Sequence, residues 1–186
     1  MLSVDDAKKI RLVIFDVDGV MTDGSIYITE EGEAFKKFNV KDGLAIELLR
    51  TYGIMTGVIS GKSSAALDTR CKSLGFDFIQ MGTANKLPVV NSLCKAYKLE
   101  YSQIAFCGDD ILDIPVMELV SISAAPLDAH PLVLEMANWI STKSGGCGMV
   151  RQFVDELIKA RTSLTLKEIY APLMESIRNS SGSLEQ

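Results

Sequence analysis

The sequence predicts an α/β fold with a doubly wound, Rossmann-like parallel sheet, and two observations support this prediction. Short runs rich in Val, Ile and Phe alternate along the chain with segments of helical period, which is typical of a parallel sheet covered by helices on both faces. The chain has 186 residues, of which 47% are hydrophobic and 23% charged. That size and composition suit one domain with a substantial core and exclude a largely disordered chain.

The order of the apolar runs supplies the expected strands and helices. The strands are Leu12–Phe15, Ile54–Ile59, Phe76–Ile79, Ile104–Cys107, Ile122–Ala124 and Trp139–Ser141. The helices are expected over residues 44–52, in a segment that ends at Gly75, over residues 86–97, near Ile114, and over residues 149–161. Gly53 and Gly75 mark helix C-termini, where a left-handed residue is favoured, and Pro88 falls in a first turn, where a main-chain N–H is not needed.

One segment departs from this alternation. Residues 25–29 and 34–38 alternate apolar and polar side chains around Glu30-Glu31-Gly32, a pattern that predicts a β-hairpin. The hairpin, about residues 24–38, follows the first strand, so it should project from the carboxyl edge of the sheet, where open α/β sheets bind ligands. We expect the domain to span residues 1–161 and to be followed by a tail, residues 162–186, whose last residues are disordered unless a neighbour orders them.

Composition indicates which kinds of partner and which cellular compartment to expect. Lys and Arg number 19 against 24 Asp and Glu, which gives a net charge of −5, and no basic run is long enough to follow a phosphate backbone. We therefore expect no nucleic-acid partner. The four cysteines are widely spaced, as in a reduced chain. Because no apolar stretch approaches the ~18 residues of a membrane span, we expect a cytoplasmic protein with no membrane partner.

Two acidic clusters follow two of the expected buried strands. The first is Asp16 and Asp18, directly after the first strand, and the second is Asp109, Asp110 and Asp113, after the fourth. Either cluster alone could be a turn or, for Asp113, a helix N-cap. Because the carboxyl ends of parallel strands share one edge of the sheet, however, the clusters should lie together. Carboxylates gathered in this way suit a hard divalent cation, most simply Mg²⁺.

Two further strand ends carry groups that complement the carboxylates. Ser60, Gly61 and Lys62 follow the second strand and offer a hydroxyl, an open backbone and a cation, while Lys86 stands at the start of a helix. A lysine taken alone is more often a solvated surface charge. Together, the four strand ends supply a nucleophile, metal ligands, a hydroxyl donor and a cation that faces phosphate.

These groups fit phosphoryl transfer through a carboxylate. Asp16 would attack phosphorus to form an aspartyl-phosphate that water then hydrolyses, and Asp18 would protonate the leaving alkoxide and activate the water. Lys86 and Mg²⁺ would neutralise charge on the phosphoryl oxygens. A receiver-type phospho-acceptor module also combines a doubly wound sheet, an acidic pair, a hydroxyl and a lysine. Receivers carry the acceptor aspartate on a middle strand, whereas here it follows the first strand.

Several motifs of the chain resemble those of a known family. DVDGVMTDG, SGK, NKL and GDDILD resemble the four motifs of the haloacid dehalogenase superfamily of aspartate-nucleophile phosphatases. FNVKDG, RCKSLG, DAHP and SGGCGMVR have counterparts in the branch that hydrolyses the 8-phosphate of the eight-carbon sugar acid 3-deoxy-D-manno-octulosonate. The resemblance, over about residues 10–160, implies a Mg²⁺-dependent sugar-acid phosphatase without a cap domain, in lipopolysaccharide precursor biosynthesis. The alternative substrate is a nine-carbon keto-sugar acid 9-phosphate.

The resemblance also implies roles for individual residues. Asp16 would be the nucleophile and a metal ligand, Asp18 the acid/base and a ligand through its main-chain carbonyl, and Asp109 the third ligand. Ser60 and Lys86 would hold the phosphoryl group. The supporting acids would be Asp110 and Asp113, and the candidate substrate-binding residues are Thr22, Asp23, Gly24, Lys41, Gly61, Lys62 and Arg70.

Three positions depart from the family pattern, namely Lys41, Lys62 and Cys147, where relatives commonly carry arginine or another basic residue. Lysine keeps the charge but loses the planar fork that pairs with a carboxylate, so these positions bear on which sugar acid is preferred. The missing cap has a separate implication. Capless members close their sites by assembly, and the resemblance implies a homotetramer in which hairpins meet and a neighbour's C-terminal segment covers the site.

Overall fold

Six parallel strands form the central sheet of the protein, which we describe over residues 1–179 of a computed structural model. Their order in the sheet is β5 (Phe78–Gln80), β4 (Met55–Ile59), β1 (Leu12–Phe15), β6 (Ile104–Cys107), β7 (Ile122–Ala125) and β8 (Trp139–Ile140). In the register of this sheet, Phe15 lies between Val58 and Cys107. The carboxyl ends of β4, β1 and β6 are therefore neighbours, and the residues that follow them share one edge.

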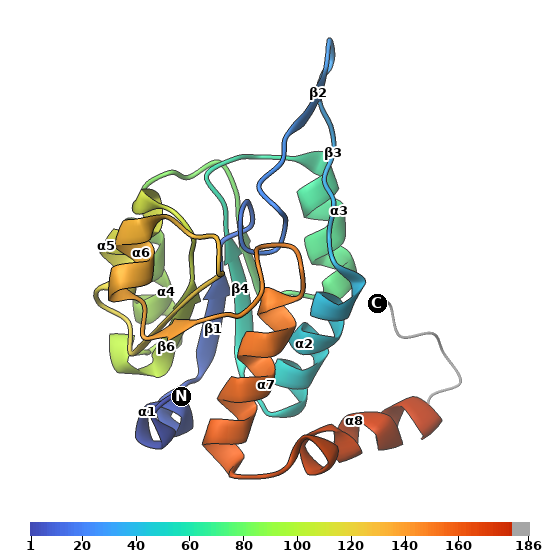
Figure 1. Cartoon of the computed structure of the whole chain (residues 1–186), viewed down its shortest axis with the longest axis vertical. Helices are drawn as coiled ribbons and strands as arrows, with labels where there is room; N and C mark the ends of the chain where they lie inside the picture. Colours follow the sequence, from blue (N-terminus) through green and yellow to red (C-terminus); the bar gives the residue numbers. More distant parts are fainter. Residues whose placement is uncertain (180–186) are drawn as a thin grey trace.

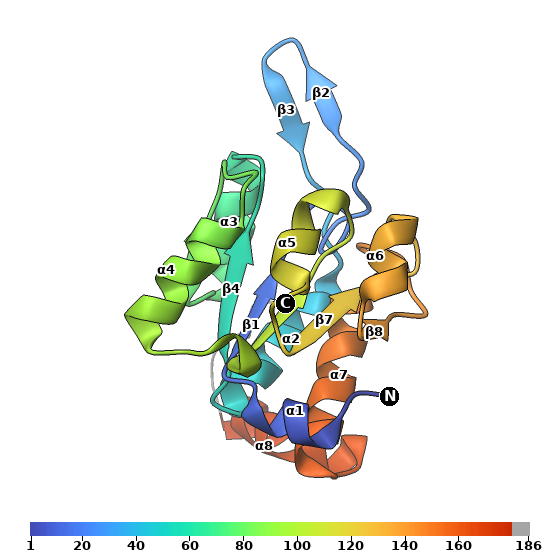
Figure 2. The same cartoon turned by 90° about the vertical axis from the view of Figure 1, so that its left-hand side faces the viewer.

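Helices cover both faces of the sheet (Figure 1, Figure 2). One face carries α2 (Val40–Thr51), α3 (Ala65–Leu74) and α7 (Met149–Thr162), and the other carries α4 (Leu87–Tyr97), α5 (Ile114–Met117) and α6 (Pro131–Met136). The 3₁₀ turns η1 (Tyr101–Gln103) and η2 (Ile111–Asp113) precede β6 and α5. Near the amino ends of the strands lie α1 (Val4–Lys9) and α8 (Leu166–Asn179).

β1 shows how the sheet divides the core. All four of its residues are buried, and they alternate between the two faces. Val13 and Phe15 pack into the cluster that includes side chains of α2 and α7, whereas Leu12 and Ile14 pack into the cluster that includes those of α4 and α5. A strand that is buried on both faces is a continuous apolar run in the sequence, which is why the sequence predicts it.

The predicted fold class is confirmed: the sheet is parallel and doubly wound, and residues 1–179 contain no cap domain. The element boundaries differ in two informative places. β5 starts two residues later than expected, because the main-chain N–H of Phe76 bonds to the oxygen of Cys71 and completes the end of α3. The sequence does not predict α1, since this helix has six residues and buries only Ala7, too little to show a helical period.

The region after α7 contains a helix that the sequence pattern indicates only in part. α8 buries Ile169 and Leu173 although Pro172 lies inside it. The hydroxyl of Tyr52, the C-cap residue of α2, donates to the main-chain oxygen of Ile169 at 3.0 Å and fixes α8 to the domain. The disorder expected over residues 179–186 falls, apart from Asn179, outside the described residues. A contact between the tail and a neighbouring subunit stays a prediction.

The predicted hairpin is confirmed as β2 (Tyr27–Thr29) and β3 (Gly32–Phe35). It projects from the carboxyl edge of the sheet beyond the rest of the molecule (Figure 1). Tyr27 and Phe35 stack with ring centroids 4.3 Å apart, while the side chains of Ile28 and Phe35 are 72% and 53% exposed. An isolated two-stranded sheet is marginally stable in water, so this apolar surface is suited to burial by another chain.

Two further findings concern membrane spans and the state of the cysteines. Across the part of the chain that the structure describes, no helix combines the length and the apolar character needed to cross a membrane. The four cysteines, Cys71, Cys94, Cys107 and Cys147, are free thiols.

Candidate active site

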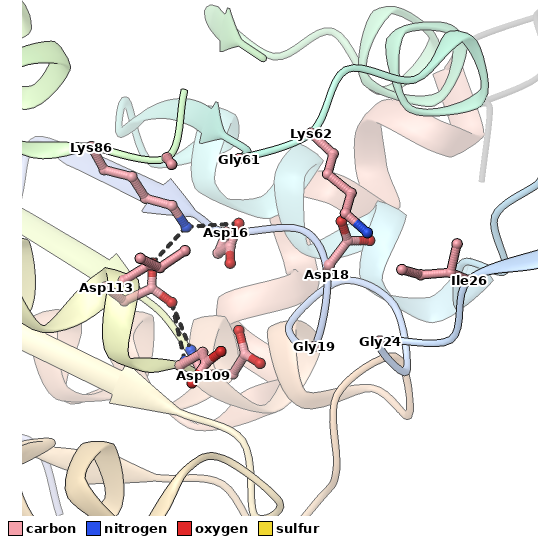
Figure 3. A pocket seen from close by; sticks show the side chains of 13 residues that line it. Asp16, Asp18, Gly19, Gly24, Ile26, Gly61, Lys62, Lys86, Asp109 and Asp113 are labelled. Atoms are coloured by element: carbon pink, nitrogen blue, oxygen red, sulfur yellow. Dashed lines mark hydrogen bonds and ion pairs between the residues drawn. The ribbon is translucent and has the colours of Figure 1, made fainter. Parts of the chain in front are cut away.

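A cavity of ≈410 Å³ lies at the carboxyl edge of the sheet, next to the start of the hairpin (Figure 3). The loops after β1, β4, β5 and β6 all reach it, as the parallel topology predicts. The charged residues that line it are Asp16, Asp18, Lys62, Lys86, Asp109, Asp110 and Asp113. Four stretches that are far apart in the sequence thus meet in one place.

Lys86 is the buried cation of this cavity. It directly precedes α4 and is 3% exposed. Its ammonium lies 2.9 Å from Asp16 Oδ1 and 2.5 Å from Asp113 Oδ1 (Figure 3). Burial lowers the pKa of Lys86, but the two carboxylates raise it more, so the pKa lies above its ordinary value. Lys86 is therefore a fixed positive charge beside the predicted nucleophile.

Asp113 organises the second acidic loop. It is fully buried, and its Oδ2 accepts hydrogen bonds from the main-chain N–H groups of Asp109 at 3.0 Å and Asp110 at 3.3 Å. Asp113 stands at the N-cap position of α5, as the alternative interpretation expects, but its side chain makes no capping hydrogen bond to that helix. Asp110 is exposed and caps η2 by accepting from the N–H of Ile111 at 2.8 Å. The two supporting acids therefore differ: buried Asp113 holds Lys86 and the main chain of the β6 loop, whereas exposed Asp110 lies at the rim of the site.

Three carboxylates form a group that suits a divalent cation. One oxygen from each of Asp16, Asp109 and Asp113 lies within 4.8 Å of the others, and Asp109 Oδ1 is buried with no hydrogen-bond partner among residues 1–179. Burial and neighbouring carboxylates raise the pKa of Asp16 to about 6 and that of Asp109 to about 8, against the opposing effect of Lys86. Such repelling, incompletely paired carboxylates are stabilised when a cation binds between them, and oxygen ligands fit the predicted Mg²⁺.

Gly19 shows how closely the two acidic loops approach each other. Its φ is +87°, and a Cβ built on it would lie 2.0 Å from Asp109 Oδ2. A side chain at this position would displace the Asp109 carboxylate, and the left-handed φ itself favours glycine. The Asp-x-Asp-Gly order therefore has a steric cause, because the glycine leaves room for the acid that the β6 loop supplies.

Asp18 has a partner that the sequence analysis missed. The ammonium of Lys36, directly after β3, lies 2.6 Å from Asp18 Oδ1 and 3.1 Å from Glu33 Oε2. Ser64, the N-cap of α3, donates to Glu33 Oε1 at 2.5 Å. In the sequence, Lys36 is one of two adjacent lysines in a hairpin strand, which resembles a solvated charge. Its place beside Asp18 depends on how the base of the hairpin lies against the β1 loop.

The predicted substrate-binding residues fall into two groups. Those that line the cavity are Gly24, Gly61 and Lys62. Those that do not line it are Thr22, Asp23, Lys41 and Arg70. The Thr22 hydroxyl accepts from the N–H of Gly24 at 3.2 Å, and Asp23 pairs with Lys37 at 3.0 Å, so both shape the start of the hairpin. Arg70 lines a separate groove between α3 and the hairpin strand β3.

Ser60 and Lys41 have local main-chain roles. Ser60 is buried at the end of β4, and its hydroxyl accepts from the N–H of Lys62 at 3.3 Å, which orders the loop that carries this lysine. Lys41 is exposed in the first turn of α2, and its main-chain oxygen accepts from Arg151 at 3.4 Å. The roles predicted for these side chains toward substrate stay predictions.

The DAHP and SGGCGMVR motifs make main-chain contacts with each other and with the two acidic loops. Asp128 Oδ1 accepts from the N–H of Gly145 at 2.9 Å, and Gly146 donates to the oxygen of Val20 at 3.0 Å. The N–H of His130 donates to the oxygen of Asp109 at 2.8 Å. The His130 ring accepts from the N–H of Leu132 at 3.2 Å and caps α6. The DAHP and SGGCGMVR motifs are therefore parts of the scaffold of the site.

Comparisons with known proteins agree with this geometry. A family model for haloacid dehalogenase-like hydrolases matches residues 62–151. The 3-deoxy-D-manno-octulosonate 8-phosphate phosphatase KdsC of Escherichia coli K12 is 40% identical over 158 residues, which cover 85% of this chain and 84% of KdsC. The crystal structure of that phosphatase from Yersinia pestis has a TM-score of 0.82 at 40% identity and 85% coverage of both chains.

A third relative was solved with ligands. The 3-deoxy-D-manno-octulosonate 8-phosphate phosphatase of Moraxella catarrhalis, in complex with magnesium, phosphate and KDO, matches with a TM-score of 0.85 at 32% identity, covering 94% of this chain and 97% of that one. The acidic cavity, the capless fold and these identities lead to the same assignment. The chain belongs to the 3-deoxy-D-manno-octulosonate 8-phosphate phosphatase family of haloacid dehalogenase-like hydrolases.

Proposed function

We propose that this protein hydrolyses 3-deoxy-D-manno-octulosonate 8-phosphate to the free sugar acid and phosphate through an aspartyl-phosphate, in lipopolysaccharide precursor biosynthesis. The observation that carries the proposal is the buried ion-pair cluster at the sheet edge, where Lys86 joins Asp16 to Asp113 and Asp109 Oδ1 has no partner among the described residues. Relatives that are 32% to 40% identical over most of the chain are named as phosphatases for this substrate.

The reaction takes place in two displacements at phosphorus. In the first, a carboxylate oxygen of Asp16 forms a bond to phosphorus, the ester P–O bond breaks, and the proton of Asp18 passes to the leaving oxygen. In the second, water attacks the phosphorus, its proton passes to Asp18, and phosphate leaves as the Asp16 carboxylate is restored. Lys86 compensates negative charge that develops on the phosphoryl oxygens. No redox partner is needed, since atoms and protons balance over the cycle.

The metal ligands that we assign are the carboxylates of Asp16 and Asp109 and the main-chain carbonyl of Asp18. Bound Mg²⁺ would supply positive charge that neutralises the carboxylates and the phosphoryl oxygens. Asp113 supports this set indirectly, because it holds Lys86 and the main chain of Asp109 at the same time.

The sugar-acid end of the substrate extends toward the mouth of the cavity, and here we assign Gly24, Gly61 and Lys62. Lys41 and Arg70 lie outside the cavity of one subunit, so a role for them toward substrate is proposed through assembly. We propose a homotetramer in which the exposed hairpins meet. The exposed apolar side chains of Ile28 and Phe35 support this proposal. We also place the protein in the cytoplasm, since free cysteines suit a reducing compartment.

A comparison of kcat/KM values tests the substrate assignment. The panel contains the eight-carbon sugar-acid 8-phosphate, its nine-carbon 9-phosphate relative and ordinary hexose 6-phosphates, all with Mg²⁺. We expect the eight-carbon substrate to exceed the hexose phosphates by about 100-fold, because polar groups built for one ligand are left unpaired by another. A higher kcat/KM for the nine-carbon substrate would identify the alternative activity. Equal values for all sugars would refute the assignment, and a fully active monomer would refute the tetramer.

A further inference from the structure

A single buried ammonium joins the base of the hairpin to the first acidic loop. The side chain of Lys36 is 1% exposed and lies between the carboxylates of Asp18 and Glu33, whose side chains are 26% and 19% exposed. A lysine buried to this degree is costly unless it is paired, and here both of its partners are charged. Glu33 is held in turn by Ser64 at the start of α3. The hairpin is thus held both to the β1 loop and to the start of α3, and Lys36 is the point where it touches Asp18.

This contact decides where the Asp18 carboxylate lies. Asp18 stands in a loop between Val17, which is fully buried, and Gly19, which has a left-handed φ of +87°. Asp18 lines the cavity, and its Oδ1 is held at 2.6 Å by Lys36. A general acid must lie within hydrogen-bond reach of the atom it protonates, and a misplacement of ~1 Å costs about 100-fold in rate. The ion pair is thus the contact through which the hairpin reaches the predicted acid/base.

We propose that Lys36 is a positioning residue for the acid/base Asp18, so that the hairpin takes part in proton transfer to the leaving group. This inference rests on the proposed function. As the oxygen of Asp16 bonds to phosphorus and the ester P–O bond breaks, the proton of Asp18 passes to the leaving sugar oxygen. Lys36 keeps its own protons and stabilises the Asp18 carboxylate that remains. In the second displacement Asp18 recovers a proton from the attacking water.

The test compares leaving groups that do and do not need a proton. Lys36→Met removes the ammonium, Lys36→Arg keeps the charge, and Glu33→Gln weakens the hairpin anchor without removing the partner of Asp18. Lys9→Met is the control, because Lys9 is exposed and pairs with Asp6 at 3.3 Å on α1, at the opposite end of the molecule (Figure 2). The rate of the first turnover is measured by rapid mixing with the sugar-acid 8-phosphate and with 2,4-dinitrophenyl phosphate, which releases a stable phenolate.

We expect Lys36→Met to slow the first turnover about 100-fold with the sugar-acid phosphate and less than about tenfold with the aryl phosphate. Lys36→Arg should recover part of this loss, Glu33→Gln should change both rates by the same factor, and Lys9→Met should change neither. Equal losses with both substrates in Lys36→Met would show a purely structural role and overturn the proposal. If Lys36→Met does not fold, Lys36→Gln is used for the same ratio.

The same design separates this inference from the proposed function. A wild-type protein that does not turn over the eight-carbon substrate refutes the proposed function. The role of Lys36 is then measured with whichever alkyl phosphate the wild type hydrolyses fastest, again against the aryl phosphate. An unchanged ratio of the two rates would overturn the positioning role whatever the natural substrate is.

Discussion

Replacing Asp16 by Asn changes one side-chain oxygen into nitrogen, and it should move activity and stability in opposite directions. An amide is a poor nucleophile, so turnover of sugar-acid and aryl phosphates should be lost. The effect on stability follows from the surroundings of Asp16, which is 9% exposed. Burial and the charge of Asp113 raise its pKa from 3.8 to about 6, although Lys86 acts in the opposite direction. A shift of roughly two pKa units corresponds to about 3 kcal/mol.

The sign follows from the direction of the shift. The folded protein without metal binds the Asp16 proton more tightly than the unfolded chain does, so the ionised carboxyl lowers stability. This cost is absent below the unfolded value of 3.8, grows as the pH rises, and is complete above about 6. Asn stays neutral at every pH. At pH 8 without metal, Asp16→Asn should therefore be more stable than the wild type by up to about 3 kcal/mol, and the difference should shrink toward pH 4.

Urea unfolding followed by circular dichroism measures this difference in the presence of EDTA. Adding Mg²⁺ should then stabilise the wild type more than the variant, because the cation binds the folded state and the variant lacks one charged ligand. A variant that is less stable than the wild type at pH 8 in EDTA would refute the idea that repulsion between carboxylates is the dominant charge effect at Asp16. Substantial residual turnover by the folded variant would refute its assignment as nucleophile.

Three further predictions use other parts of the molecule. Chelation by EDTA should abolish turnover, and added Mg²⁺ should restore it. At low Mg²⁺ concentration, the KM for substrate should fall as the Mg²⁺ concentration rises. A KM that does not depend on Mg²⁺ would show that the cation acts only in catalysis. Burial raises the pKa of Asp42 from 3.8 to about 6, so the ionised carboxyl destabilises the folded protein at high pH. Between pH 4 and pH 8, urea unfolding should show that the wild type loses about 2–3 kcal/mol more stability than Asp42→Asn. Parallel pH profiles for the two proteins would contradict this. Ile28→Glu places a charge on a side chain that is 72% exposed on the hairpin, and it should reduce the mass measured by light scattering to that of smaller species, whereas an unchanged tetramer would place the interface elsewhere.

Local patterns in the sequence account for the sheet and for the acids of the site. β1 and β6 are buried on both faces, so they are continuous apolar runs, and the acids that follow them are brought together by topology alone. The hairpin is equally local, because its alternation and its turn are adjacent in the chain. These features could be predicted since each depends on neighbours in sequence or on a general rule of parallel sheets.

The contacts of Lys36 could not be predicted in the same way. Its partner Asp18 is 18 residues away, and the pairing depends on the angle at which the hairpin leaves the sheet, which no residue pattern encodes. The position of Arg70 is a similar case: its place on α3 follows from sequence, but the groove it lines is formed with β3. Asp110 and Asp113 look alike in the sequence, and only the 3₁₀ turn between them makes one a rim residue and the other fully buried.

The charge of the cavity explains why a cation should be needed for binding as well as for chemistry. Five carboxylates and two ammonium groups line it, so its formal charge is negative before a phosphate ester arrives. Lys36 does not change this balance, because its ammonium compensates Asp18 while its second partner, Glu33, adds one more carboxylate. The net charge of −5 on the whole chain has the same sign, although salt screens it beyond ~8 Å. A phosphate dianion therefore meets a repulsive site until a divalent cation is present, which is the physical reason for expecting the KM, and not only kcat, to depend on Mg²⁺.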